Sequence, residues 1–184
     1  SGSSVFEGEE TEVSVLFADV RGFTSFSEGV DPAEAVQLLN RLFDLIVPVL
    51  HEHGGHANHY LGDGLLAIFG APNPLEAHAD ASVAAAVDIQ RRVRAQFGTT
   101  LRLGIGINTG PVIAGTLGGG GRHEFTVIGD TVNVASRIEG KAPGGGVAIG
   151  PGTKALLPGG GTESLGLLGL KGKGVAKADG SHGD

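Results

Sequence analysis

The sequence lacks several features, and each absence excludes a class of protein. It contains no cysteine, which excludes disulfides, thiolate metal sites and cysteine nucleophiles. No apolar run approaches the roughly 18–20 residues that are needed to span a bilayer. Only 13 basic residues stand against 20 acidic ones, giving a net charge of −7. That balance argues against nucleic acid as a partner, because such a protein needs a basic face to replace the counterions around phosphates.

What the sequence does contain is typical of one globular domain. The chain has 184 residues, of which 40% are hydrophobic and 18% are charged, so it can bury a substantial core. Residues 1–8 begin with a Ser/Gly-rich stretch and no methionine, and we expect them to be a cloning remnant or linker. We expect the domain to cover residues 9–178 and residues 179–184 to form a flexible tail. A cytoplasmic domain excised from a larger protein, with regulatory domains elsewhere in that protein, is the expected context.

Glycine is the residue in clear excess, with 34 copies against an average of ~7%. Runs at Gly118–Gly121, Gly144–Gly146 and Gly159–Gly161 are separated by apolar stretches and show no collagen period. They therefore predict hairpin and loop tips rather than disorder.

Hydrophobic patterning predicts an α+β fold. The apolar run Thr11–Ala18 has the β-branched and aromatic content of a buried strand. Asp31-Pro32 is typical of a helix start, and that helix carries one apolar stripe and ends at Gly54-Gly55. A turn is expected at Thr109-Gly110-Pro111. Two further helices are expected, over Leu75–Phe97 and Gly129–Glu139, and they pack on a largely antiparallel sheet. The remaining strands are expected at His56–Leu61, Leu65–Phe69, Leu101–Asn108, Val112–Thr116, Glu124–Ile128, Val147–Ile149, Ser164–Leu170 and Val175–Lys177.

Two aspartates at predicted strand ends are candidates for a metal site. Asp19 follows the apolar run Val15–Ala18, and Asp63 lies between two glycines at a hairpin tip. A carboxylate beside an apolar strand is costly unless it is paired or binds a cation, and hard divalent cations such as Mg²⁺ prefer oxygen ligands. Carboxylates on neighbouring strands could hold two ions for a displacement at phosphorus. Two unrelated turn aspartates are the alternative at this point.

Two further segments are candidates for binding a nucleotide. Residues Val20–Phe26 run from the strand through a glycine turn into a short predicted helix, whose free backbone N–H groups suit a phosphate. Asn133 and Arg137 are four positions apart and therefore share one face of a helix. An amide and a guanidinium on one face can contact a ribose and a phosphate, and a surface pair without function is the alternative.

Four motifs, in order and spacing, resemble the catalytic domain of the class III nucleotidyl cyclases. They are Phe17–Thr24, Leu61–Gly64, Arg102–Ile105 and Thr126–Arg137, and the resemblance covers nearly the whole chain. It implies a ferredoxin-like βαββαβ core with a small β/α extension. It also implies a head-to-tail homodimer with two active sites, each shared between both chains and each binding ATP with two Mg²⁺ or Mn²⁺ ions.

The resemblance assigns metal and triphosphate roles to one part of the chain. Asp19 and Asp63 match the metal-binding aspartates, and the carbonyl of Val20 matches a further metal ligand. Phe23 and Thr24 lie where backbone amides of the family hold the triphosphate.

Other matched positions supply positive charge and orient the ribose. Arg102 matches an arginine that contacts the terminal phosphates, and Lys171, with Lys173 as the alternative, matches a lysine that reaches the β and γ phosphates. Asn133 matches the asparagine that orients the ribose from the partner chain, and Arg137 matches the arginine that stabilises the transition state. The implied reaction is attack of the ribose 3′-hydroxyl on the α-phosphorus, giving 3′,5′-cyclic AMP and pyrophosphate.

Base selection is where the sequence departs from the family pattern. Adenylyl cyclases of the family usually carry lysine where this chain has His59, and commonly aspartate where it has Thr126. A histidine N–H can donate to adenine N1 and the Thr126 hydroxyl can accept from N6, but a neutral imidazole can also suit guanine. The resemblance favours ATP, although His59 enforces that choice less firmly than the usual lysine, and we expect an adenylyl cyclase. A guanylyl or relaxed-specificity cyclase and a catalytically silent nucleotide-binding dimerisation domain are the alternatives.

Histidines also gather between His51 and His59, where a zinc site is an alternative to consider. The spacing crosses a predicted helix end, a Gly-Gly turn and a strand. Convergence on one ion is not implied by that spacing, so we expect solvated loop histidines.

Overall fold

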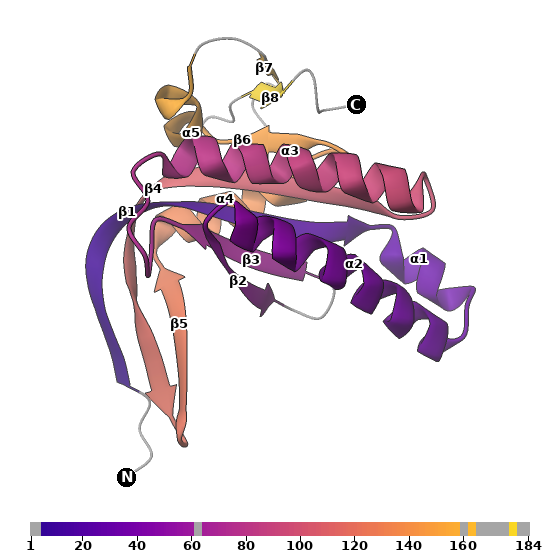
Figure 1. Ribbon diagram of the computed structural model, residues 1–184, viewed down its shortest axis with the longest axis horizontal. Helices are drawn as coiled ribbons and strands as arrows, with labels where there is room; N and C mark the ends of the chain where they lie inside the picture. The colour runs from indigo at the N-terminus through magenta and orange to yellow at the C-terminus, as the bar shows by residue number, and fades with distance from the viewer. Residues whose placement is uncertain (1–4, 61–63, 159–161, 165–176, 180–184) are drawn as a thin grey trace.

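The computed structural model describes residues 5–60, 64–158, 162–164 and 177–179. Its centre is one sheet of eight strands, with helices packed against it (Figure 1). The first strand, β1 (Val5–Arg21), lies in the middle and pairs antiparallel with β3 (Gly64–Phe69) and with β4 (Arg102–Gly119). β3 pairs in turn with β2 (Gly55–Tyr60).

The order β2-β3-β1-β4, with antiparallel neighbours throughout, is the ferredoxin-like core that the family resemblance implies. Four short or outlying strands extend this core beyond β4. Strand β6 pairs parallel with β4, β8 pairs with β6, β7 pairs with β8, and β5 forms a hairpin with β4. Their bounds are Arg122–Ile128 for β5, Val147–Ile149 for β6, Thr162–Ser164 for β7 and Lys177–Asp179 for β8.

Successive side chains on β1 point to opposite faces of the sheet. Both faces therefore carry apolar side chains, and helices cover both. Leu16, Ala18 and Val20 pack into the core shared with α2 (Pro32–Glu52) and α3 (His78–Phe97). Val13, Val15 and Phe17 point to the other face, where Ala135 of α4 (Asp130–Lys141) joins the cluster. Two helices of six residues each, α1 (Phe23–Glu28) and α5 (Pro151–Leu156), complete the fold.

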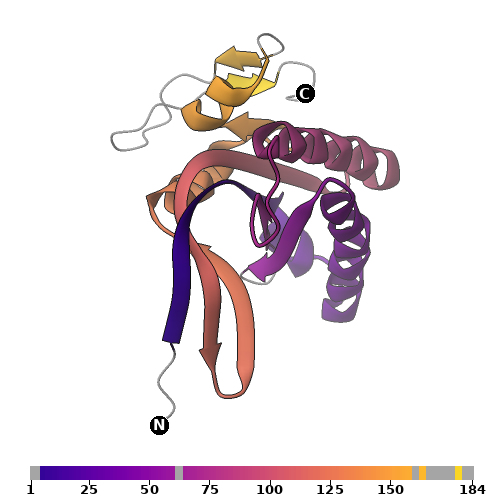
Figure 2. The same cartoon turned by 60° about the vertical axis from the view of Figure 1, so that its left-hand side comes forward.

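Local signals explain where several elements begin and end. The Asp31 side chain accepts a hydrogen bond from the Ala33 amide and caps α2, as the Asp-Pro pair predicts. The glycine run 118–121 forms the tip of the β4–β5 hairpin, where Gly120 and Gly121 have positive φ. That hairpin and the first half of β1 form an arm that projects from the body (Figure 2).

Strand β4 contradicts the predicted turn at Thr109-Gly110-Pro111. It is one continuous strand, in which Pro111 lies opposite Glu12 of β1. The proline is tolerated because the neighbours on its other side, β6 and β5, pair with β4 only at residues 105–107 and 113–119. No ladder donor is therefore lost at Pro111.

Other boundaries differ from the predictions by smaller amounts. β1 begins at Val5, within the range expected to be a linker, and pairs there with Gly118. α3 begins at His78 rather than Leu75, and α5 was not predicted because it is short and begins at a Pro-Gly pair. β7 and β8 lie beside the predicted strands Ser164–Leu170 and Val175–Lys177, most of which lie outside the described residues.

A buried chain of polar side chains ties the sheet to α3 and α5. His78 Nδ1 lies 2.8 Å from Ser14 Oγ, which lies 2.7 Å from Thr109 Oγ1, which lies 2.8 Å from Thr153 Oγ1. At its outer end His78 Nε2 lies 3.4 Å from a Glu12 carboxylate oxygen. Buried hydroxyls in such a chain satisfy one another's hydrogen bonds.

Within the described residues, no helix has the length and hydropathy of a membrane span.

Candidate active site

Asp19 lies near the end of β1, on the face of the sheet that α4 covers. Its neighbours across the sheet are both glycines, Gly64 on β3 and Gly104 on β4, so neither flank contributes a side chain over the carboxylate. The Asp19 side chain is 41% exposed, yet its Oδ1 atom is buried. Hard divalent cations prefer carboxylate oxygens, so this carboxylate, with glycines on both flanks, suits a cation ligand.

The sequence predicts that the strand ends at Asp19, but in the structure β1 continues to Arg21. Arg21 Nη1 lies 4.0 Å from Asp19 Oδ2 and 3.3 Å from Glu139 Oε1 on α4. The guanidinium also donates to the backbone carbonyls of Glu139 and Ala142. Sequence reasoning missed Arg21, although its position two residues after Asp19 places both side chains on one face of the strand. Arg21 therefore fixes α4 against the strand that carries Asp19.

The strand–turn–helix segment after Asp19 is confirmed. Gly22 has φ +70°, which glycine adopts without strain, and α1 begins at Phe23 with Thr24 as its second residue. Phe23 packs against the core of α2 and α3, and the Val20 side chain is buried in that same core. The first turn of α1 thus lies directly beyond the end of the Asp19 strand.

Arg102 reaches the same end of the sheet from the neighbouring strand. It is the first residue of β4, is exposed, and pairs with Arg21 in the β1–β4 register. Two residues on, Gly104 pairs with Asp19. Gly64, which follows Asp63, pairs with Asp19 from the other side, while Asp63 itself and Lys171 lie outside the described residues.

A second group of predicted residues lines an open cleft of about 620 Å³ beside α4. Asn133 and Arg137 are exposed on one face of α4, and Thr126 approaches from β5. Phe17, two residues before Asp19 on the same face of β1, is part of the cleft wall. The cleft therefore lies on the sheet face that Asp19 occupies.

The position of α4 is set by close packing and by backbone hydrogen bonds. A Cβ at Gly106 of β4 would clash with the backbone of Glu139, so only glycine allows the helix to approach this closely. Asn108 Nδ2 donates to the Thr131 carbonyl at 3.1 Å, and Thr131 Oγ1 donates to the Pro111 carbonyl at 2.7 Å. The helix that presents Asn133 and Arg137 is thus anchored along its length.

The histidines that follow α2 have separate surroundings. His53 Nε2 lies 3.3 Å from Asp88 Oδ2 on α3, and the His56 ring meets Phe125 edge-on with centroids 5.5 Å apart. His59 lies on β2 opposite Leu65, and its side chain is outside the described part. Among the side chains that the structure describes, no three His, Asp or Glu converge as metal ligands.

The surroundings of Asp88 change the acidity of its carboxyl. Burial raises the pKa of its carboxyl, but hydrogen bonds from Arg92 and His53 outweigh burial and hold that pKa below its ordinary value. The Arg92 bond spans one helical turn, with Nε 3.0 Å from Asp88 Oδ1. The cluster joins the end of α2 to the middle of α3 and lies away from the residues described above.

Comparison with known proteins identifies one family, whose model matches most of the chain. Residues 5–178 match the model of the "Adenylate and Guanylate cyclase catalytic domain" family. The chain is 43% identical over 131 residues to the "Uncharacterized protein Rv1320c" of Mycobacterium tuberculosis, which covers 71% of this chain but only 23% of that protein. The chain therefore spans less than a quarter of that relative's length.

Solved structures with the same fold include cyclases of both nucleotide specificities. The catalytic core of a rhodopsin-guanylyl cyclase with converted specificity, in complex with ATPαS, matches with a TM-score of 0.84 and 32% identity, covering 94% of this chain and 96% of that one. The adenylyl cyclase CyaB from P. aeruginosa matches with a TM-score of 0.82 and 28% identity, covering 94% of both chains.

Proposed function

The chain belongs to the adenylate and guanylate cyclase catalytic domain family, and from that premise we propose that it converts ATP to 3′,5′-cyclic AMP and pyrophosphate in a homodimer with shared sites. The observation that carries the proposal is the separation of the expected residues into two groups, one at the end of the β1–β4 pair and one beside α4. Asp19, the start of α1 and Arg102 lie at the end of the β1–β4 pair. Asn133 and Arg137 line the cleft beside α4.

The residues present fit a divalent metal, since Asp19 offers hard carboxylate oxygens, one of them buried. In the proposed site Asp19, Asp63 and the Val20 carbonyl hold Mg²⁺ or Mn²⁺, two ions in all. When bound, the ions supply Lewis acidity to the ribose 3′-hydroxyl and to the triphosphate.

The other side chains act on the charges that change during the reaction. The amides of Phe23 and Thr24 hold the triphosphate, and Arg102 and Lys171 compensate negative charge on its outer phosphates. Asn133 of the second chain orients the ribose so that its 3′-oxygen faces the α-phosphorus. Arg137 of the same second chain stabilises the charge that grows on the α-phosphoryl oxygens in the transition state.

ATP is proposed over GTP because the family resemblance favours it and the base-contacting positions are compatible with adenine. The Thr126 hydroxyl can accept from adenine N6 and a His59 N–H can donate to N1. We also propose a cytoplasmic location for the catalytic domain, whether or not the parent protein is attached to a membrane. GTP is the second candidate, since His59 replaces the lysine expected of an adenylyl cyclase and the structural neighbours include guanylyl cyclases.

Parallel assays with ATP and GTP, each with Mg²⁺ and with Mn²⁺ and with product identification, test this proposal. We expect cyclic AMP to form faster than cyclic GMP at equal nucleotide concentration. A faster GTP reaction would reverse the assignment of substrate. No cyclic product from a dimeric sample would indicate instead a silent nucleotide-binding dimerisation domain.

A further inference from the structure

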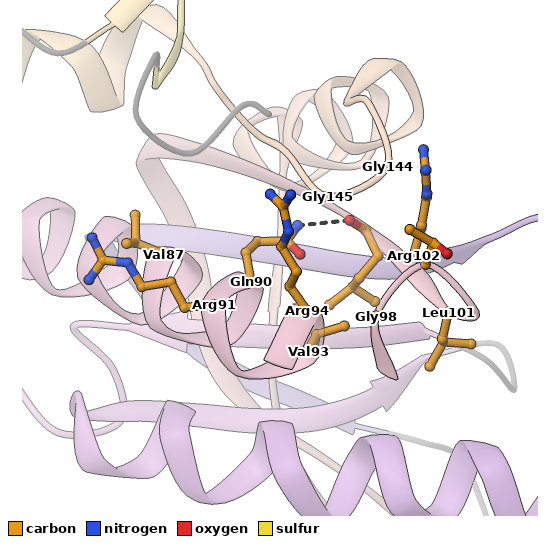
Figure 3. Close-up of a pocket in the computed structure, with 12 residues that line it drawn as sticks. Val87, Gln90, Arg91, Val93, Arg94, Gly98, Leu101, Arg102, Gly144 and Gly145 are labelled. Atoms are coloured by element: carbon orange, nitrogen blue, oxygen red, sulfur yellow. Dashed lines mark hydrogen bonds between the residues drawn. The ribbon is translucent and has the colours of Figure 1, made fainter. Parts of the chain in front are cut away.

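A second pocket, of about 210 Å³, lies on the opposite side of β4 from the α4 cleft, between α3 and the loop that precedes β6 (Figure 3). Its lining residues come from α3, from the connection between α3 and β4, from the start of β4 and from the glycine loop at 144–145. Neither the family motifs nor the proposed reaction assigns a role to the α3 part of this pocket. Its chemistry combines an apolar floor with an arginine-rich rim.

The floor of the pocket is buried and rigid. Val93, Leu101 and Leu103 are at most 3% exposed. Gln90, which is itself buried, donates to the Leu103 carbonyl at 2.7 Å and to the Gly146 carbonyl at 2.9 Å. These bonds hold the start of β4 against the glycine loop, so the pocket is preformed rather than a gap between loosely packed segments.

Three arginines surround this floor. Arg94 and Arg102 rise towards the glycine loop, whereas Arg91 points away from Arg102 (Figure 3). Within the described part of the chain none of the three forms an ion pair, unlike Arg21 and Arg92. The described lining contains no acidic residue, although acidic residues outnumber basic ones in the whole chain.

Guanidinium groups that form no ion pair with the described residues, above an apolar floor, are suited to one class of ligand. Guanidinium binds carboxylate and phosphate groups in a two-pronged geometry and stacks on flat groups, while the floor favours an apolar body. A cavity of about 150 Å³ can hold benzene, so the present volume holds a small ring with one anionic group. We infer that this pocket binds a small organic anion, a carboxylate or phosphate ester with a compact apolar body.

Occupancy of the pocket has a consequence for catalysis that rests on the proposed function. Arg102 lines this pocket and is also the residue proposed to contact the outer phosphates of the nucleotide. A ligand that engages the Arg102 guanidinium removes it from the nucleotide. The anion therefore competes with nucleotide binding and raises the apparent KM for ATP while leaving kcat nearly unchanged.

Binding can be tested without any catalytic readout by titrating the ¹⁵N-labelled protein with benzoate and, separately, with uncharged benzamide. We expect benzoate to shift the amide signals of Gly98, Thr99, Gly144 and Gly145 saturably, and benzamide to shift them far less. Arg94→Gln should weaken benzoate binding about tenfold, the scale of one lost charged hydrogen bond. The matched control is Arg92→Gln, a paired arginine on the same helix, which should bind benzoate like the wild type.

The outcomes separate the inferred site from the proposed reaction. Equal shifts with benzoate and benzamide, or benzoate affinity unchanged by Arg94→Gln, would overturn the anion site whether or not the protein is a cyclase. Confirmed binding with no rise in the KM for ATP in an active sample would overturn the competition through Arg102. A sample that binds benzoate but makes no cyclic nucleotide would count against the proposed function alone.

Discussion

Consecutive side chains at the end of β1 point to opposite faces of the sheet and have different roles. Val20 points into the α2–α3 core, whereas Asp19 and Arg21 point to the α4 face. Asp19 has glycines on both flanks, and Arg21 binds the end of α4. One strand end therefore carries both a candidate metal ligand and the anchor of the helix that presents Asn133 and Arg137.

Replacing Asp19 with alanine is expected to abolish cyclase activity and leave the fold intact. The substitution removes the carboxylate proposed to hold the metal, and the fold is expected to survive because the Asp19 side chain is 41% exposed. Activity and thermal unfolding are measured together. Glu9→Ala, which removes an exposed carboxylate from the same strand, is the control and should stay active, and near-wild-type turnover in Asp19→Ala would refute the metal assignment.

Arg137→Ala is expected to lower kcat. The expected loss of transition-state stabilisation is about 3–4 kcal/mol, the scale of one lost oxyanion donor. The side chain is exposed on α4, so its loss should scarcely change stability. Single-turnover rates at saturating nucleotide measure the effect. Lys141→Ala on the same helix removes a cation without entering the cleft, and an equal loss of rate in that variant would assign the effect to general charge.

Secondary-structure elements show where sequence patterns predict structure and where packing decides it. The helix over 32–52 is confirmed, because Asp31, Pro32 and one apolar stripe all indicate the same element. The turn at Thr109-Gly110-Pro111 is wrong, because turn propensity is local whereas the β1 partner of Pro111 comes from a distant part of the chain. Arg21 was missed for a similar reason, since its partner Glu139 lies 118 residues away.

Two glycines around α4 are expected to respond in opposite directions to alanine. At Gly106 a Cβ would clash with the Glu139 backbone, whereas at Gly140 on α4 it meets nothing within 4 Å. We expect Gly106→Ala to destabilise the domain by about 1–3 kcal/mol and to reduce activity by displacing α4. Gly140→Ala is the matched control and should stabilise by about 0.5–1 kcal/mol. Denaturant unfolding measures both, and equal effects would contradict the tight contact between α4 and β4.

The contact between α2 and α3 is expected to weaken in acid. The pKa of Asp88 is held below its ordinary value in the folded state. Its stabilising contribution is therefore present above the unfolded-state pKa of about 3.9 and is lost as the pH falls through the folded-state pKa. The difference in unfolding free energy between wild type and Asp88→Asn should be largest near neutral pH and shrink below about pH 4. In an Arg92→Gln background that pH dependence should be smaller, and an unchanged dependence would assign it to other carboxylates.

At the scale of the whole molecule, the sheet has one face closed by two long helices and another covered in part by α4. The closed face holds the larger core, and the α4 face carries Asp19, the open cleft and the arm of β4 and β5. The sequence predicts this layered α+β fold because strand and helix periods are local. It cannot place Asn133 and Arg137 relative to Asp19 in the proposed shared site, because in that proposal the distance depends on how two chains assemble.

Mixing inactive variants tests the shared site most directly. Asp19→Ala chains and Arg137→Ala chains are each expected to be inactive as homodimers. Combined in equal amounts and allowed to exchange, they should recover about a quarter of wild-type cyclase activity, because half of the dimers are mixed and each mixed dimer has one intact site. No recovered activity, in a mixture in which mixed dimers are shown to form, would contradict a site built from both chains.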